Sequence, residues 1–347
     1  MCSGGKIHGR IMSCSVILPC KLPVFSAYHY QMCGMVPAMA SASGYNWYLN
    51  ECIQLSCSEN LLSGYDQDGV IIENSSFLEN PHLEVKYVYE LGNWDSIISG
   101  IRDALAHGRY VYFCGADDYY LPGKSNYGEE HVSHDGLIYG CDDEKAELSV
   151  MAYSSNWVCR GFPILYENFR KSLQNIIDEA NRWFGFFAYI KAGKETVPLD
   201  VFRIHSQLCE YLDSNIGKFP YAGPGRKYGI VVHDYICRLL ELACDGYLSA
   251  ESLDLRLLRV IWEHKMCMMD RLQALNGYFN EPGEFSGGYD RVVDLSDRAR
   301  MIYARNSVRP DSRLPRLIIS DLQKLKAYEA GLLEKVCTSL SARLKNL

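Results

Sequence analysis

The sequence contains no long apolar run, and no stretch reaches the roughly 18 apolar residues that a membrane-spanning helix needs. Its most apolar N-terminal stretch, Ile11 to Leu22, is short, is interrupted by Pro19, and lacks the charged start and cleavage pattern of a signal peptide. Glycine and proline, 28 and 12 of 347 residues, are too few for a collagen-like or low-complexity chain. We therefore expect a folded protein of the cytoplasm.

Positive charge is also scarce. The chain has 35 Lys and Arg residues against 42 Asp and Glu residues, which gives a formal net charge of -7. Broad nucleic-acid binding needs an electropositive surface that neutralises phosphates, so the charge balance argues against that class. A length of 347 residues predicts about two domains, at roughly 150 residues each.

Cysteine is abundant, with fourteen residues, but no CxxC pair occurs. A structural zinc site usually takes its four ligands from two close pairs, so the spacing argues against zinc, and we expect neither a metal nor a cofactor. Most of the cysteines lie in apolar runs, such as Cys114 in YVYFCG and Cys237 in YICRLL, where they are typical of small buried side chains. Reduced thiols are favoured over disulfides.

The hydrophobic pattern changes character along the chain. A first helix is expected over 46–57, and a second over 94–108, with Asn93 or Asp95 as its cap and Gly108 as its end. Alternation predicts strands over 83–90, 109–122, 131–140 and 146–153. Helical patterns then follow over 168–184, 229–243, 252–275 and from Asp311 onward. The predicted fold class is α+β, with an all-helical C-terminal half.

The densest group of titratable residues lies between Asp117 and Asp143. His131 and His134 stand three residues apart where a strand leaves a polar, glycine-bearing loop. An imidazole at the mouth of a strand suits general-base catalysis, because its usual pKa near 6.5 needs little adjustment. The alternative is a structural histidine bonded to a neighbouring carboxylate.

Three motifs, ADDYYLP, HVSHDGLIYGCDDE and ELSVMAY, follow one another within residues 110–153. This block resembles the N-terminal domain of the butirosin-biosynthesis acyltransferase family, a branch of the papain-like cysteine-peptidase superfamily. The later segment IWEHKMCMMDRL is similar to helical domains that follow this module in peptide-antibiotic gene clusters. The resemblance implies a papain-like domain over 15–165 and a helical domain over 166–347 that covers its cleft.

The resemblance also implies a reaction. An acyl group passes from a carrier-protein thioester to an amine and forms an amide, in the biosynthesis of a nonribosomal peptide or a related natural product. His134 matches the family histidine and is the expected base, with Asp117 as an orienting group. The residues expected to contact the substrate are Asn46, Trp47, Tyr120, His131, Glu263, His264 and Arg271. The expected partners are an acyl or peptidyl carrier protein and an amine, and the apolar helical half is compatible with a homodimer.

The sequence departs from the family at the nucleophile. The helix start that carries a cysteine in papain-like enzymes reads GYNWYL here; Cys33 precedes Asn46 by 13 residues and Cys52 follows it by six. Either Cys33 folds over the site, or His134 deprotonates an amine that attacks the thioester directly, which is the option we favour. Two other hypotheses stay open: a catalytically inactive binding module for a carrier protein or peptide, and a cysteine hydrolase with a relocated thiol.

Overall fold

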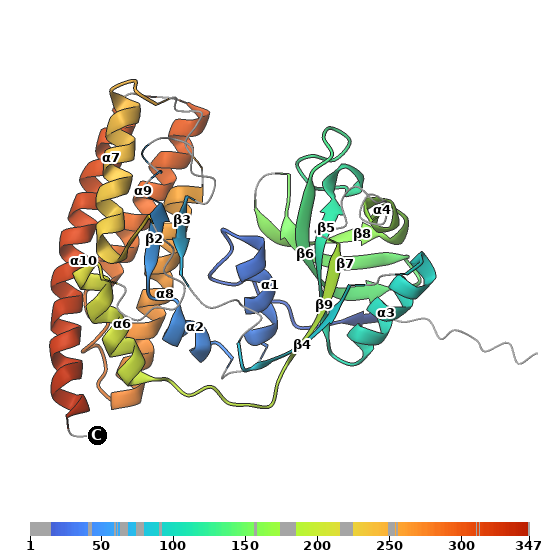
Figure 1. The fold of residues 1–347 in the computed structure, drawn as a ribbon, viewed down its shortest axis with the longest axis horizontal. Helices are drawn as coiled ribbons and strands as arrows, with labels where there is room; N and C mark the ends of the chain where they lie inside the picture. Colours follow the sequence, from blue (N-terminus) through green and yellow to red (C-terminus); the bar gives the residue numbers. More distant parts are fainter. Residues whose placement is uncertain are drawn as a thin grey trace, which may run out of the picture. The chain divides into compact units, whose positions relative to one another are not determined.

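The structure is a computed structural model that describes residues 15–40, 44–58, 60, 62, 69–73, 80–89, 92–155, 158–173, 185–215, 225–248, 254, 256–309, 311 and 313–345 (Figure 1). The chain forms two compact units, each assembled from separated segments. The sheet unit comprises Met1–Leu22, Val36–Ala40 and Leu83–Gly193, and the helical unit comprises Pro23–Met35, Ser41–His82 and Lys194–Leu347. The sequence predicts a single domain boundary, between residues 165 and 166, whereas the segments of the two observed units alternate along the chain.

The sheet unit is built on an antiparallel sheet in the order β4-β9-β5-β6-β7-β8, and β1 pairs with the last residues of β6, beyond the start of β5. Valine, isoleucine and aromatic residues dominate these strands, as a half-buried pleated surface favours. The strands are β1 (Ser15–Ile17), β4 (Leu83–Val88), β5 (Tyr110–Asp117), β6 (Ser133–Asp142), β7 (Glu147–Tyr153), β8 (Cys159–Leu165) and β9 (Phe186–Ala192).

One face of this sheet holds the core of the unit. Helix α3 (Trp94–Ala106) contributes Ile97 and Ile101 to the same buried cluster as Val111 and Phe113 of β5. Asn93 begins the helix as predicted, because its Oδ1 accepts a hydrogen bond from the Ser96 amide at 3.0 Å. Gly108 follows the helix with a φ of 71°, which confirms its predicted role as the stop.

Two strands of the sheet lie where the sequence pattern predicts either a helical region or no regular element. β8 and β9 both fall outside the predicted strands, and β9 lies within the stretch 166–347 that was predicted to be all-helical. The helix predicted over 168–184 is observed as α4 (Tyr166–Ser172), and residues 174–184 lie outside the described residues. The all-helical prediction was therefore wrong at β9, whose hydrogen-bonding partners β4 and β5 come from far earlier in the chain.

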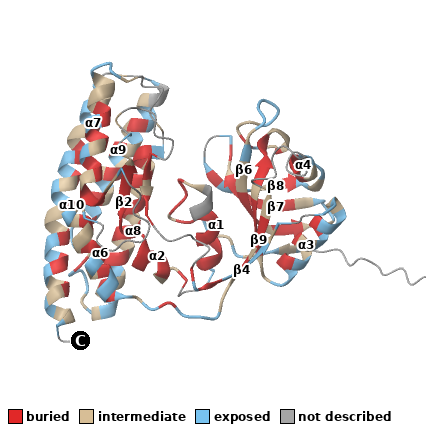
Figure 2. Ribbon diagram, viewed as in Figure 1, coloured by how far each residue is buried: buried red, intermediate tan, exposed pale blue. Residues whose placement is uncertain are grey.

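The helical unit contains long helices and a small three-stranded sheet of order β10-β2-β3. Its elements are α1 (His29–Ala38), whose last residues are grouped with the sheet unit, α2 (Asn46–Glu51), β2 (Leu55–Ser58), β3 (Val70–Ile72), α6 (Val201–Asp213), β10 (Arg226–Tyr228), α7 (Val232–Cys244), α8 (Arg256–Phe279), α9 (Asp290–Val308) and α10 (Leu314–Leu344). Buried residues run along the length of α8 (Figure 2). Among the described helices, none has the length and apolar character needed to cross a membrane.

The predicted helix over 46–57 was wrong in its second half. Helix α2 ends at Glu51, and the chain turns into β2, which pairs with β3 and β10. Leu55 and Cys57 are fully buried in that sheet. Pairing with a strand about 170 residues away, as the register Tyr228 to Ser56 shows, overrides the local helical spacing. At the coarser level the prediction holds: the protein is α+β, with an antiparallel sheet and a helical C-terminal region.

Candidate active site

Two histidine–aspartate pairs lie side by side where β5 ends and β6 begins. Nδ1 of His134 is 2.6 Å from Oδ2 of Asp118, and Nδ1 of His131 is 2.7 Å from Oδ2 of Asp117. Asp117 is the last residue of β5, and Asp118 begins the short 3-10 helix η3 (Asp118–Tyr120). The sequence therefore supplies two consecutive carboxylates, and each one orients a different imidazole.

The strand register brings these residues together. Ala116 is opposite His134 in the β5–β6 pair, and the register shifts between Phe113 and Ala116, which marks a bulge in β5. Bulges are frequent beside active sites, because the extra residue re-aims the side chains that follow it. The pairing continues past the strand, where the Asp118 amide donates to the Val132 carbonyl at 2.9 Å. Asp118 is thereby held next to the start of β6, the strand that carries His134.

Behind His134 lies a buried ion pair. Nζ of Lys124 is 3.3 Å from Oδ1 of Asp118, and the two side chains are only 3% and 1% exposed. Burial lowers the pKa of Lys124, and the nearby Asp118 charge opposes that shift. A buried carboxylate is costly unless it is paired, so Lys124 and His134 together make the position of Asp118 tolerable. The imidazole of His134 is 29% exposed, so this chain of bonded side chains runs from the interior to the surface.

This geometry selects a tautomer for His134. Because Nδ1 faces a carboxylate oxygen at 2.6 Å, the neutral ring carries its proton on Nδ1 and its lone pair on Nε2. An imidazole held in that tautomer by a buried carboxylate is the arrangement that general-base catalysis uses. Asp118 was not named by the sequence reasoning, although the Asp-Asp doublet in ADDYYLP was visible there. Lys124 had no sequence signal beyond its place in the loop.

His131 occupies a different environment. It stacks on the ring of Tyr119, with centroids 4.2 Å apart and planes 19° apart, and Tyr120 lies at 5.8 Å. Its side chain is 56% exposed, while its partner Asp117 is 4% exposed. Asp117 also accepts the Tyr119 amide through Oδ1 at 3.1 Å, which ties the aromatic residues to the same carboxylate. His131 is thus an oriented, solvent-facing imidazole on an aromatic support, and its role and that of Tyr120 in contacting substrate stay predictions.

Three other predicted residues belong to the helical unit and are described there by themselves. Cys33 lies in α1 and is fully buried. Asn46 begins α2, and its Nδ2 donates to the Val197 carbonyl at 2.9 Å. Trp47 is 5% exposed and meets Tyr48 edge-on at 4.9 Å. These contacts explain how each side chain packs, and the assignment of all three to a substrate or nucleophile site stays a prediction.

The three residues of α8 that were predicted to contact the substrate are buried within the helical unit. Glu263, His264 and Arg271 are each 0% exposed. Glu263 accepts hydrogen bonds from Ser26 Oγ at 2.9 Å and from the Ala27 amide at 3.0 Å. Burial raises the pKa of Glu263, and the neighbouring Arg259 opposes that shift. These bonds satisfy Glu263 within its own unit.

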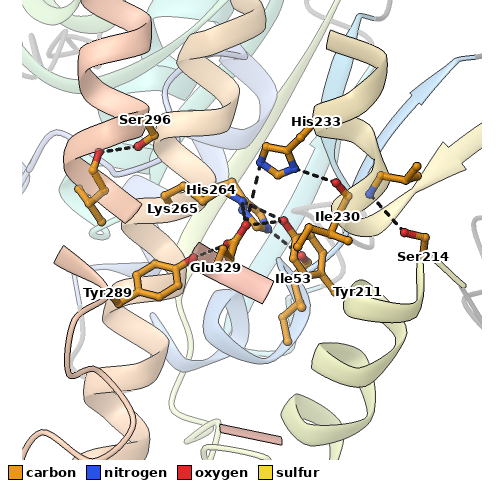
Figure 3. Close-up of polar contacts among 12 residues, drawn as sticks. Ile53, Tyr211, Ser214, Ile230, His233, His264, Lys265, Tyr289, Ser296 and Glu329 are labelled. Carbon is orange, nitrogen blue, oxygen red and sulfur yellow. Dashed lines mark hydrogen bonds and ion pairs between the residues drawn. The ribbon is translucent and has the colours of Figure 1, made fainter. Parts of the chain in front are cut away.

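Arg271 and His264 bind main-chain oxygens. Arg271 donates from Nε to the Leu49 carbonyl at 2.6 Å and from Nη2 to the Cys52 carbonyl at 2.8 Å, so it caps the C-terminal end of α2. His264 donates from Nε2 to the Ile53 carbonyl at 2.7 Å (Figure 3). Their hydrogen bonds connect α8 to the end of α2 and to the residues that follow it. The contact of these side chains with a substrate stays a prediction.

Several of the described thiols have raised pKa values. The described cysteines form no disulfide, and burial raises the pKa of Cys20 to about 11, of Cys114 to about 12 and of Cys267 to about 11. A raised pKa keeps the thiol protonated, whereas the thiolate is the nucleophile. Among the residues described, no group of three or more His, Cys, Asp or Glu side chains is placed to hold a metal ion.

Comparison with known proteins adds no family. No protein-family model matches the chain, and no curated protein is significantly similar to it.

Proposed function

We propose that the protein is an acyltransferase that forms an amide by direct attack of an amine on a carrier-protein thioester, with His134 as the general base. The observation that carries this proposal is the chain of groups His134–Asp118–Lys124, with a 2.6 Å bond between imidazole and carboxylate. The buried carboxylate fixes the ring and stabilises the imidazolium that forms when Nε2 accepts a proton. Cys33, the thiol that a covalent mechanism would use, is fully buried in α1, which favours direct attack over a covalent intermediate.

The reaction balances without any added reagent. The amine nitrogen attacks the thioester carbonyl carbon as His134 Nε2 takes a proton from that nitrogen, which gives a tetrahedral intermediate. The C–S bond then breaks, the carbonyl re-forms, and the departing thiolate takes the proton back from the imidazolium. Since a thioester is already activated, positioning and base catalysis supply the acceleration. His131, on its aromatic support, is proposed to contact the substrate beside this centre.

The finer features of the sequence reading belong to the same proposal. We propose a papain-like arrangement for the sheet unit, an acyl or peptidyl carrier protein as partner, a natural-product substrate and the cytoplasm as location. Support comes from the place of the resembling motifs: ADDYYLP covers the end of β5 and η3, and the motif with His134 opens β6. Two of the three motifs that carry the resemblance therefore supply the residues of the candidate site, and the third, ELSVMAY, forms the neighbouring strand β7.

The first experiment follows amide formation from an N-acetylcysteamine thioester and an amine. His134→Gln is expected to lower kcat/KM by about 10²- to 10⁴-fold, the usual contribution of a general base. His107→Gln is the matched control, because His107 is a 67% exposed histidine of the same unit, at the end of α3. Undiminished turnover in His134→Gln overturns the proposal. Carrier binding without turnover in the wild type also overturns it and favours the inactive binding module.

A second experiment addresses the covalent alternative. The native protein is alkylated with iodoacetamide at pH 6, and the labelled cysteines are identified by peptide mapping. An ordinary thiol titrates near 8.5, so the proposal predicts that no cysteine labels fast at this pH. Fast labelling of Cys33, lost in His134→Gln, contradicts direct attack and identifies the nucleophile of a covalent mechanism.

A further inference from the structure

A hollow in the helical unit lies away from the residues discussed so far. It has a volume of about 630 Å³ and is formed by the end of α7, the end of α9 and the start of α10. Binding sites for small molecules typically measure about 300–1,000 Å³, so its size suits a small organic ligand. Its lining residues are Cys244, Arg305, Asp311, Arg313, Leu314, Arg316 and Leu317.

The charge of this lining is strongly positive. Three arginines face one acidic residue, which gives a local net charge of +2 in a chain whose net charge is -7. Asp311 is bound by Arg313 at 2.7 Å, and this arginine lowers the pKa of Asp311 to about 2. Arg305 and Arg316 are exposed, and their guanidinium groups make no hydrogen bond or ion pair with the part of the chain that the structure describes, although Arg305 lies near enough to Asp311 to help lower the pKa of that carboxyl. Two guanidinium groups are thus available to an anion.

The start of α10 adds to this positive potential. The first turn of this 31-residue helix has no acidic residue, its N-cap residue Arg313 makes no side-chain capping bond, and the nearest carboxylate is that of Asp311, which accepts the Arg313 amide at 3.0 Å. A helix N-terminus carries a partial positive charge and favours anionic side chains nearby. Arginines at positions 313 and 316 therefore oppose the helix dipole, and a bound anion removes this repulsion. The arginine-lined hollow and the sequence of the helix start point to the same kind of ligand.

The hollow also has an apolar side. Leu314 and Leu317 lie in the first turn of α10, and Leu317 is 45% exposed. A ligand that is only an inorganic anion leaves this surface in water. We infer that the hollow binds a small organic phosphate, with its phosphoryl group on Arg305 and Arg316 and its apolar part on Leu317. Arginine suits this role, because its planar fork matches two phosphate oxygens.

The test uses phenyl phosphate, inorganic phosphate and benzyl alcohol as probes, titrated into the full chain by calorimetry. We expect phenyl phosphate to bind more tightly than inorganic phosphate, and benzyl alcohol to bind least. Arg305→Gln and Arg316→Gln are each expected to raise the Kd for phenyl phosphate about tenfold or more, the loss of one charge-assisted contact. Leu317→Ser is expected to weaken phenyl phosphate and to leave inorganic phosphate unchanged.

The matched control is Arg291→Gln. Arg291 is an exposed arginine of α9 that lies about 21 Å along the helix from Arg305, at about 1.5 Å per residue. Circular dichroism of each variant checks that the fold is intact. An equal loss in Arg291→Gln and Arg316→Gln shows only a diffuse charge effect and overturns the proposal, as does an absence of phenyl phosphate binding at millimolar concentration. Amide formation is not measured here, so this result is independent of the proposed reaction.

Discussion

A fully buried ion pair at the centre of the helical unit gives the sharpest test of its energetics. Nζ of Lys265 lies 2.7 Å from Oε2 of Glu329, and both side chains are 0% exposed (Figure 3). The ammonium also donates to the Tyr211 hydroxyl at 2.9 Å and to Nδ1 of His264 at 3.2 Å, so all three of its protons have acceptors. Glu329 in turn accepts from the hydroxyls of Tyr211 and Tyr289.

Each charge of this pair is stable in the interior only because the other one is present. Burial alone would raise the pKa of Glu329, but Lys265 and His233 lower it, and the carboxylate stays ionised. Lys265→Met keeps the length of the side chain and removes the charge, which leaves a buried carboxylate without its cation. Breaking a buried pair from one side costs about 3–5 kcal/mol of unfolding free energy. The double variant Lys265→Met/Glu329→Gln removes both charges and is expected to recover most of this loss.

Urea denaturation followed by far-UV circular dichroism measures these differences, because the long helices α8, α9 and α10 belong to this unit. The matched control is Lys326→Met, which removes an ion pair with Asp234 from the same helix α10 as Glu329. That pair is 31% and 53% exposed, so its loss is expected to cost less than about 1 kcal/mol. A Lys265→Met variant within 1 kcal/mol of the wild type, or a double variant no more stable than the single one, refutes the reasoning.

Two further predictions concern the same unit. Burial and the nearby Lys265 lower the pKa of His233 to about 4 from its usual 6.5. The stabilisation of the fold by the neutral ring is therefore complete above pH 6.5 and is lost as the pH falls toward 4, by about 3 kcal/mol. The urea midpoints at pH 7 and pH 5 should differ less in His233→Gln than in the wild type. Gly229→Ala should lower the unfolding free energy by about 2 kcal/mol or more in the same urea denaturation, because φ is 72° and the new Cβ would lie 2.4 Å from the Tyr211 carbonyl oxygen. Gly246→Ala is the control: its φ is 77°, nothing lies within 4 Å of the new Cβ, and it should cost clearly less.

Local signals in the sequence predicted the elements whose structure is decided locally. The cap at Asn93 and the stop at Gly108 bound α3, and alternation located β4, β5, β6 and β7. β8 escaped because its sequence CRGFPIL contains Gly161 and Pro163, which weaken a strand pattern. The order of the sheet explains why Pro163 is tolerated: β8 is the last strand, where a residue without an amide proton costs no ladder bond on the open side. Gly161 has a different reason, because a Cβ there would lie 2.4 Å from the Tyr139 hydroxyl.

Within the candidate site, the sequence revealed the histidines but not the buried carboxylate bound to His134. The sequence predicts one strand over 109–122, but the chain leaves β5 at Asp117 and turns into a 3-10 helix, where strand alternation does not apply. Which of two consecutive aspartates meets which histidine depends on the bulge in β5 and on the turn that follows. Lys124 enters from a loop, and only the folded chain shows that it is buried against Asp118.

The polar residues of α8 show the opposite limit of sequence reasoning. The sequence assigns Glu263, His264 and Arg271, which lie in the segment IWEHKMCMMDRL, to contact with a substrate. The folded chain gives each of them a main-chain partner: the Ala27 amide, the Ile53 carbonyl and the last carbonyls of α2. Those carbonyls are left unsatisfied by the helix itself and need donors wherever a helix ends in the interior. Because main-chain bonds account for this group of charges, the proposed chemistry depends on the partly exposed imidazole of His134 and its buried carboxylate partner Asp118.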